Sequence, residues 1–128
     1  DMVINVGALK EGRLEDVKRD IAAVRGACEG KVLKVIIEAC LLTDDEKRVM
    51  CDICTAAGAD YIKTSTGFSK GGATLEDVRL LAENAQNGLK VKAAGGMSTV
   101  SDGEAFIKAG ACRLGTSRIV KAVKQGEV

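Results

Sequence analysis

Two lysines at the ends of short apolar segments have the sequence context of reactive amines. Lys63 lies in Tyr-Ile-Lys-Thr-Ser-Thr-Gly and Lys92 in Val-Lys-Ala-Ala-Gly-Gly. The chain contains no histidine, so the imidazole group that usually transfers protons near neutral pH is absent. An amine held among apolar side chains and beside a second cation loses proton affinity and attacks carbonyl groups. The simpler interpretation is a lysine whose stem packs while its ammonium group reaches water.

The elements that must position these lysines repeat five times as a strand, a loop, an amphipathic helix and a glycine. The predicted strands begin near Met2, Lys31, Tyr61, Leu89 and Ala111. Helices are predicted over about 14–28, from 43 to before Gly58, from 74 to before Gly88, from 101 to 110 and from 117 to 124. Thr43 and Ser101 each begin a capping-box pattern. This alternation, with short loops, indicates a parallel sheet with right-handed crossovers.

Alternation inside the strands favours one architecture for this sheet. Met2, Ile4 and Val6 oppose Asp1, Val3 and Asn5, and later strands set apolar residues against charged ones in the same way. A doubly wound, flavodoxin-like sheet needs two apolar faces, whereas a barrel packs helices outside only. We therefore predict an α/β fold, a parallel (β/α) barrel of the TIM type.

The chain is too short for a complete barrel of this kind. A (β/α)8 barrel has about 250 residues, and this chain has 128. Residues 1–128 are interpreted as a single domain with five of the eight units, whose two open sheet edges must be covered by other strands. The start at Asp1, directly before a strand-like run, indicates an interior point of a longer polypeptide.

The two lysines are predicted to lie side by side. They occupy equivalent places on neighbouring strands, which are about 4.8 Å apart, and share a face with Asp1 and Glu38. Two like charges about 4 Å apart repel by roughly 4 kcal/mol at an effective dielectric near 20, so one lysine's pKa is expected to fall. Hydroxyl groups that could bind a polar substrate follow Lys63 directly, on Thr64, Ser65 and Thr66.

Two glycine turns between a strand and a helix are candidate anion sites. They are the segments 94–98, with Gly95 and Gly96, and 114–117, with Gly115, Thr116 and Ser117. Bare backbone amides at a helix start can cradle a phosphate. Ordinary turn chemistry is the alternative for each turn. The loop 67–72 is a weaker candidate, as a lid.

Composition excludes several classes of function. Apolar residues make up 46% and charged residues 29%, with a net charge of +1, which is typical of a globular protein. Few aromatic residues are present for base stacking, so no nucleic-acid partner is predicted. No apolar run approaches the roughly 20 residues of a membrane span.

The cysteines indicate a reducing compartment. Five cysteines without regular spacing do not predict a disulfide framework, so we expect a cytoplasmic protein. Cys51-x-x-Cys54 could be a redox pair or half a zinc site. It lies in a helical pattern without a second pair, so we interpret both as buried thiols and predict no metal site.

The motifs named above resemble those of deoxyribose-phosphate aldolase. The resemblance is carried by 1–9 (DMVINVGAL), 33–38 (LKVIIE), 61–68 (YIKTSTGF), 91–96 (VKAAGG) and 113–117 (RLGTS). It covers nearly the whole chain in the right order and corresponds to strands four to eight of that family's barrel, its C-terminal part. Strands one to three have no counterpart.

The resemblance implies a class I aldolase without cofactor. It implies that Lys63 forms the Schiff base, that Lys92 is its electrostatic partner and that Asp1 works with water in the proton relay. The glycine turns would bind the phosphate of 2-deoxy-D-ribose 5-phosphate, which is cleaved to glyceraldehyde 3-phosphate and acetaldehyde. The alternative function is a non-catalytic half-barrel that binds phosphate or pairs with another chain, either a second copy or the missing barrel part.

Overall fold

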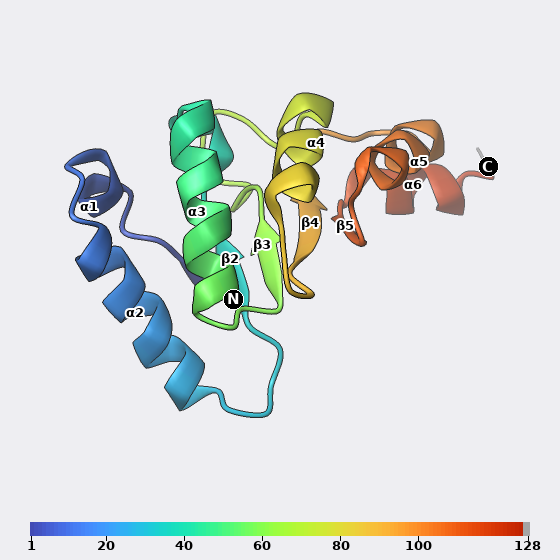
Figure 1. The fold of residues 1–128 in the computed structure, drawn as a ribbon. Coiled ribbons are helices and arrows are strands. Elements are labelled where there is room, and N and C mark those ends of the chain that lie inside the picture. The colour runs from blue at the N-terminus through green and yellow to red at the C-terminus, as the bar shows by residue number, and fades with distance from the viewer. Residues whose placement is uncertain (127–128) are drawn as a thin grey trace.

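The computed structural model describes residues 1–126, in which five parallel strands form one sheet with the helices packed along it (Figure 1). The strands are β1 (Met2–Val3), β2 (Lys34–Ile36), β3 (Tyr61–Lys63), β4 (Lys90–Ala94) and β5 (Arg113–Gly115). The helices are α1 (Val6–Lys10), α2 (Leu14–Ala27), α3 (Asp44–Ala56), α4 (Leu75–Asn84), α5 (Val100–Ala109) and α6 (Arg118–Lys124), with a 3-10 turn η1 (Ala39–Leu41).

The strand order confirms the predicted partial barrel. Hydrogen-bonded neighbours follow the chain as β1-β2-β3-β4-β5. Each unit therefore places its strand beside the preceding one, as strands do around a (β/α) barrel. A flavodoxin-like sheet instead has the order 2-1-3-4-5. Within residues 1–126, β1 and β5 each have a neighbour on one side only, so both edges are open.

The two faces of the sheet differ as the alternation predicts. Val35, Ile62 and Val91 are buried and belong to the core shared with the helices. Their strand neighbours Lys34 and Lys63 point to the other face, which no helix of residues 1–126 covers. That uncovered face corresponds to the inside of a barrel.

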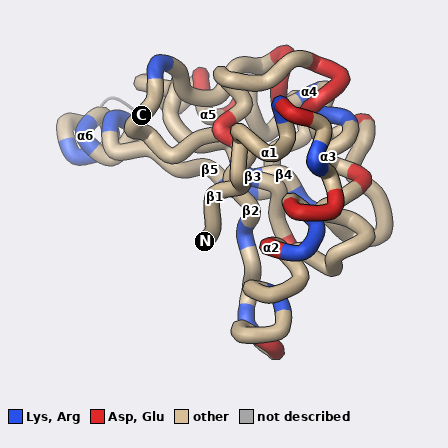
Figure 2. The backbone as a smooth tube through the Cα atoms, turned by 90° about the vertical axis from the view of Figure 1, so that its left-hand side faces the viewer, with Lys and Arg blue, Asp and Glu red and all other residues tan. Residues whose placement is uncertain are grey.

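Helix starts carry local capping and acidic residues. Thr43 begins α3 with the predicted capping box, in which its hydroxyl accepts from the Glu46 N–H. Acidic residues lie in the first turns of α2, α3 and α4, where they complement the helix dipole, while α6 has only basic charges (Figure 2).

The predicted start of α5 at Ser101 is wrong. Thr99 caps this helix and Asp102 completes the capping box.

The first strand is shorter than its alternation predicts. Val6 does not continue the strand but begins α1, because the Asn5 side chain accepts a hydrogen bond from the Ala8 N–H at 3.0 Å. Asparagine is among the best N-cap residues, and here it ends the extended segment after Val3. The next helix, α2, packs Val17 and Ile21 into the core as predicted.

The cysteine pair of α3 is structural. Cys51 and Cys54 are fully buried in the core. Burial raises the pKa of each thiol to about 12, so neither forms a thiolate near neutral pH. The interpretation as buried thiols is confirmed. None of the helices within residues 1–126 has both the length and the apolar character that crossing a bilayer requires.

Candidate active site

Lys63 and Lys92 lie next to each other on the uncovered face of the sheet. Lys63 of β3 is the register partner of Lys92 of β4, and Lys92 is in turn the partner of Arg113 of β5. Both lysine side chains are partly buried. The predicted juxtaposition of the two lysines on one face is therefore confirmed.

Asp1, which directly precedes β1, contacts Lys63 of this pair through its carboxylate. The Lys63 ammonium donates to Asp1 Oδ2 at 2.9 Å, and Lys34 Nζ lies 3.0 Å from Asp1 Oδ1. One carboxylate therefore holds two ammonium groups. The structure brings together Lys63, Lys92 and Asp1, all three predicted as catalytic.

Lys34 is a site residue that the sequence interpretation did not select. In β2, Val35 points into the core, so its neighbour Lys34 must point to the charged face together with Ile36. That alternation was a signal that could have identified Lys34. Its register partner is Tyr61, one step away from Lys63 along the same face. The alternation alone did not predict that Lys34 shares the Asp1 carboxylate with Lys63.

Burial is the first cause of the lowered lysine pKa values. The pKa of Lys63 lies below its usual value because burial disfavours the ammonium form and because Lys34 repels it. The pKa of Lys92 is lowered by burial first, then by repulsion from Lys63, Lys34 and Arg113. The lowered pKa is confirmed, but repulsion ranks second to burial. For Lys63, that repulsion comes from Lys34.

The hydroxyl groups after Lys63 are engaged within the chain. Thr64 is fully buried, accepts from the Ala94 N–H at 3.1 Å and so ties β3 to β4. Ser65 donates to the Thr64 hydroxyl at 3.1 Å. Thr64 and Ser65 therefore stabilise the sheet in this structure, although the sequence suggested hydroxyls open to a substrate.

Thr66 is held by Glu38 at the end of β2. Its N–H donates to Glu38 Oε1 at 3.2 Å, and its hydroxyl donates to the other carboxylate oxygen. The Thr66 hydroxyl also accepts from the Phe68 N–H at 3.0 Å. Glu38 itself has a positive φ of 43°, which is uncommon for a residue other than glycine. This contact fixes the beginning of the loop that follows β3.

Gly95 and Gly96 form a tight turn pressed against the loop before α4. Both have φ of +71°, and a Cβ on Gly96 would lie 2.0 Å from the Ala73 carbonyl oxygen. The Gly95 N–H donates to the Gly115 carbonyl at 2.8 Å, so it is already used. The Gly96 N–H, by contrast, has no hydrogen-bond partner among residues 1–126.

The second predicted turn lies beside the first. The Thr116 hydroxyl lies 3.3 Å from the Met97 carbonyl oxygen and 3.4 Å from the Ile119 N–H. Ser117 occupies the N-cap position of α6 without a side-chain capping bond. Gly115 leaves room for Lys92, because a Cβ at Gly115 would lie 3.2 Å from Lys92 Cε. The two turns and Lys92 therefore form one connected region at the ends of β4 and β5.

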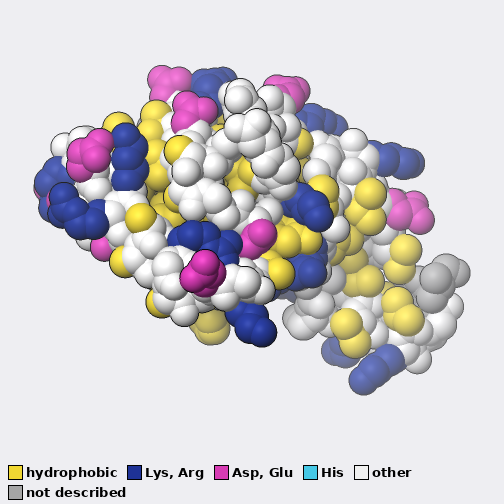
Figure 3. Space-filling model, turned by 60° about the horizontal axis from the view of Figure 1, so that its bottom comes forward, with side chains coloured by type: hydrophobic (Ala, Val, Ile, Leu, Met, Phe, Trp, Pro, Cys, Tyr) yellow, Lys and Arg dark blue, Asp and Glu magenta, His cyan; other side chains and the backbone are white. Residues whose placement is uncertain are grey.

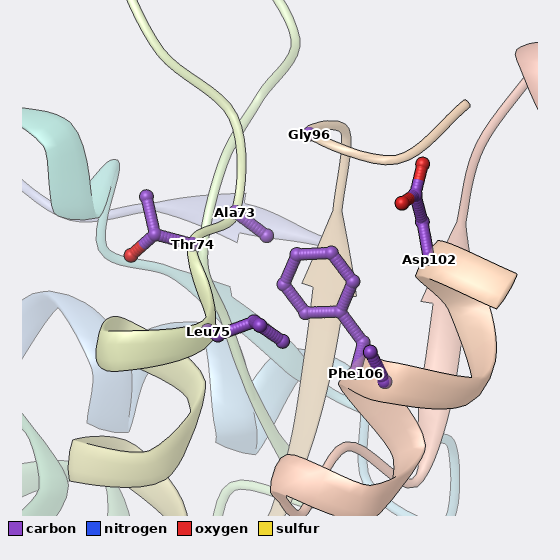
Figure 4. A pocket seen from close by; sticks show the side chains of 7 residues that line it. Ala73, Thr74, Leu75, Gly96, Asp102 and Phe106 are labelled. Carbon is purple, nitrogen blue, oxygen red and sulfur yellow. The ribbon is translucent and has the colours of Figure 1, made fainter. Parts of the chain in front are cut away.

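A separate hollow lies on the helix side of the sheet, between the starts of α4 and α5 (Figure 4). Phe106 projects into it beside Leu75, and Asp102 lies at its rim. The Asp102 carboxylate already accepts from the Ser98 and Thr99 N–H groups, which lowers its pKa. No lysine lines this hollow, but Gly96 of the glycine turn does, so the hollow adjoins that turn on the side away from the lysines. Within the described residues no group of three or more His, Cys, Asp or Glu side chains is placed to hold a metal ion.

Comparison with known sequences confirms the resemblance found in the motifs. The chain is 58% identical over all 128 residues to a deoxyribose-phosphate aldolase from Streptococcus pneumoniae (strain Hungary19A-6). It is 51% identical over the same length to one from Streptococcus agalactiae serotype Ia. It spans 58% and 57% of these relatives' own lengths. No protein-family model matches the chain.

Solved structures share the fold. A Coccidioides immitis protein assigned as a deoxyribose-phosphate aldolase superposes with a TM-score of 0.93 at 45% identity, over 100% of this chain and 52% of that one. An aldolase called QR15 has a TM-score of 0.88 at 38% identity, over 98% and 58%. The aldolase from Aeropyrum pernix, described as a unique tetramer, has a TM-score of 0.77 at 35% identity, over 86% and 50%.

Proposed function

We propose that this chain, all of whose residues align with deoxyribose-phosphate aldolases, is the lysine-bearing, C-terminal part of such an enzyme. The reaction is the reversible cleavage of 2-deoxy-D-ribose 5-phosphate to D-glyceraldehyde 3-phosphate and acetaldehyde. The observation that carries the proposal is the contact of Asp1 with Lys63, a lysine of lowered pKa that is paired in register with Lys92.

Lys63 is the nucleophile of the proposed reaction. Its neutral amine adds to the C1 carbonyl of the open-chain sugar, and loss of water gives a protonated imine. The electron pair of the C2–C3 bond moves into this imine while the C3 hydroxyl gives up its proton. Glyceraldehyde 3-phosphate leaves, and protonation of the remaining enamine at C2 followed by hydrolysis releases acetaldehyde.

Asp1 and Lys92 support this sequence in different ways. Asp1, which accepts from Lys63, is placed to take up and return protons through water. Lys92 places a second positive charge beside Lys63, while the repulsion that lowers the pKa of Lys63 comes from Lys34. The lowered pKa values and the shared carboxylate have no role in a non-catalytic half-barrel, so that alternative is not favoured.

The glycine turns are proposed to bind the substrate phosphate. The Gly96 N–H and the Ser117 side chain are among the groups of these turns left available within residues 1–126, while Gly95, Gly115 and Thr116 shape the turns through their internal hydrogen bonds. Thr66 contributes from the opposite loop, held by Glu38. We further propose a cytosolic enzyme, because five free cysteines suit a reducing compartment, and an oligomer by analogy with the Aeropyrum pernix tetramer.

Reductive trapping tests the assignment of Lys63. The chain is joined to the remaining part of the Streptococcus pneumoniae relative, incubated with acetaldehyde and borohydride, and mapped by mass spectrometry. We expect a two-carbon adduct on Lys63 and loss of sugar-phosphate cleavage in Lys63→Ala. Lys108→Ala, an exposed substitution on α5, is the control and keeps both signals. Trapping that is equal at Lys63 and at surface lysines would reject the proposal.

A further inference from the structure

Glu38 is a buried carboxylate at the strand-end side of the sheet, outside the contacts of the lysines. It lies two residues after the end of β2, and only 6% of its surface is exposed. A buried carboxylate is stable only where a cation or hydrogen-bond donors compensate its charge. The lysines of the candidate site do not supply the cation, because Lys34 and Lys63 bind Asp1, and Glu38 takes part in no ion pair within residues 1–126.

The local backbone does not explain a glutamate at this position either. Glu38 has a φ of 43°, in the left-handed region that glycine adopts without a steric cost. It precedes the 3-10 turn η1, but its side chain forms no capping hydrogen bond with that turn. Backbone strain of this kind persists only where the surrounding structure imposes it. The reason for the carboxylate therefore lies in another segment.

Both carboxylate oxygens of Glu38 are used by one residue, Thr66, in the loop after β3. Oε1 accepts from the Thr66 N–H at 3.2 Å, and Oε2 accepts from the Thr66 hydroxyl. The same hydroxyl accepts from the Phe68 N–H at 3.0 Å. A hydroxyl has a single proton, and here the negative charge on Glu38 takes it, so the direction of each hydrogen bond is fixed.

We propose, on the basis of the proposed function, that Glu38 is a positioning residue: it holds the Thr66 hydroxyl so that this group meets the substrate only as an acceptor. Thr66 is partly exposed and follows Lys63 by three residues. Its oxygen has two lone pairs, and Phe68 uses one, so one remains for a ligand that donates. A sugar hydroxyl donates, whereas phosphate oxygens mainly accept. Glu38 therefore directs Thr66 to a hydroxyl of the sugar and away from the phosphate.

The rest of this loop is supported by the segment that follows Glu38. Cys40 Sγ lies 3.5 Å from Ser69 Oγ, and a Cβ at Gly71 would lie 3.1 Å from Cys40 Cβ. Only the tip of the loop projects, since Phe68 is 96% exposed. These contacts do not involve the carboxylate, so a change at Glu38 is expected to release the Thr66 proton while the loop keeps its place.

Steady-state kinetics of Glu38→Gln tests this role in the enzyme formed by joining the chain to the remaining part of the Streptococcus pneumoniae relative. Glutamine keeps the shape of the side chain but presents an NH2 donor to the Thr66 hydroxyl, whose proton then has no acceptor. We expect KM for 2-deoxy-D-ribose 5-phosphate to rise about tenfold, with kcat within about twofold. Borohydride trapping of acetaldehyde on Lys63 and inhibition by inorganic phosphate should be unchanged, because neither ligand has a sugar hydroxyl.

Two further variants separate positioning from support of the fold. Glu29→Gln removes the same charge between α2 and β2, at the opposite end of the sheet, where charged side chains of both signs lie on the surface, and should leave KM unchanged (Figure 3). Thr66→Val removes the hydroxyl itself and should raise KM as Glu38→Gln does. Combining Thr66→Val with Glu38→Gln should raise KM no further, because Glu38 acts through that hydroxyl.

Several results would overturn the role of Glu38. They are an unchanged KM in Glu38→Gln, effects that multiply in the double variant, and weaker inhibition by inorganic phosphate. A lower unfolding midpoint together with equal losses of kcat and of acetaldehyde trapping would show a merely structural residue. If the unsubstituted enzyme fails to trap acetaldehyde on Lys63, the proposed function is refuted and this inference with it. Successful trapping combined with any of the other results refutes the role of Glu38 alone.

Discussion

Replacing Lys34 with methionine removes one of the two ammonium groups that share the Asp1 carboxylate and keeps an unbranched side chain of similar length. Lys34 Nζ lies 3.0 Å from one Asp1 oxygen and Lys63 Nζ 2.9 Å from the other. Repulsion from Lys34 is one cause of the lowered pKa of Lys63, after burial. The substitution removes this cause and leaves Asp1 to Lys63 alone, so the pKa of Lys63 rises.

The size of the effect follows from the geometry of the shared carboxylate. Two charges roughly 6 Å apart repel by about 3 kcal/mol at an effective dielectric of 20. The Asp1 charge and partial contact with water screen some of this energy. If about half of it remains, the neutral fraction of Lys63 near pH 7 falls roughly tenfold in Lys34→Met, at about 1.4 kcal/mol per factor of ten.

Competitive reductive alkylation measures this neutral fraction in the chain itself. Acetaldehyde and cyanoborohydride are supplied in limiting amounts, and peptide mapping gives the modification rate of Lys63 relative to exposed Lys108. Taking the ratio of the variant to the unsubstituted chain cancels the poorer access to Lys63. We expect this ratio to fall about tenfold in Lys34→Met, and to be constant in Lys18→Met, which removes an exposed charge on α2.

The pH dependence gives the result that would refute this reasoning. A lowered pKa means that Lys63 becomes reactive at a lower pH than a lysine of ordinary pKa, and Lys34→Met moves the Lys63 profile to higher pH. An unchanged ratio with an unchanged profile would show that Lys34 exerts no field on Lys63. Burial alone would then account for the lowered pKa.

Three further outcomes test the scaffold around the site. Lys47→Met leaves the buried Asp77 carboxylate, now 2.6 Å from Lys47 Nζ, without its partner, so urea unfolding should show a loss of about 3–5 kcal/mol. In the folded chain burial lowers and the Asp77 hydrogen bond raises the pKa of Lys47, with a net rise, so the stability from this pair is lost only as pH increases through that raised pKa. Gly96→Ala places a Cβ 2.0 Å from a carbonyl oxygen and should prevent normal folding, whereas Gly12→Ala, with φ of +75° and open space, should cost only about 1–2 kcal/mol in the same assay. Near pH 8 the α3 thiols of Cys51 and Cys54 should resist iodoacetamide until the chain is unfolded, because burial raises the pKa of each to about 12.

Local patterns predicted most of the fold, and they were wrong where two local signals competed. The Thr43 capping box was identified because both partners lie within four residues. The sequence around α5 contains two such patterns, one from Thr99 to Asp102 and one from Ser101 to Glu104, and only the packing of the helix selects the first. In β1, apolar alternation and the capping ability of Asn5 overlap, and the cap prevails.

The candidate site was predictable where it depends on register and not where it depends on contacts between distant segments. Alternation on β3 and β4 was sufficient to pair Lys63 with Lys92. The bridge from Asp1 to Lys34 depends on how a strand of two residues pairs with β2, which no local pattern specifies. The engagement of Thr66 by Glu38 depends on a positive φ at a glutamate, for which the sequence gives no signal.

Completion of the barrel would act on the two lysines in two opposite ways, through burial and through any carboxylates that the added strands bring. Burial is the first cause of the lowered pKa of both Lys63 and Lys92, so covering the uncovered face strengthens that cause. A carboxylate placed beside either lysine would cancel it by stabilising the ammonium form. Lys90 lies two residues closer to the beginning of β4, about 7 Å from the row of Lys63 and Lys92, whereas Arg113 lies in that row beside Lys92. A carboxylate beside Lys90 would therefore neutralise part of this face without restoring the proton affinity of Lys63, whereas one beside Arg113 would also stabilise the ammonium form of Lys92.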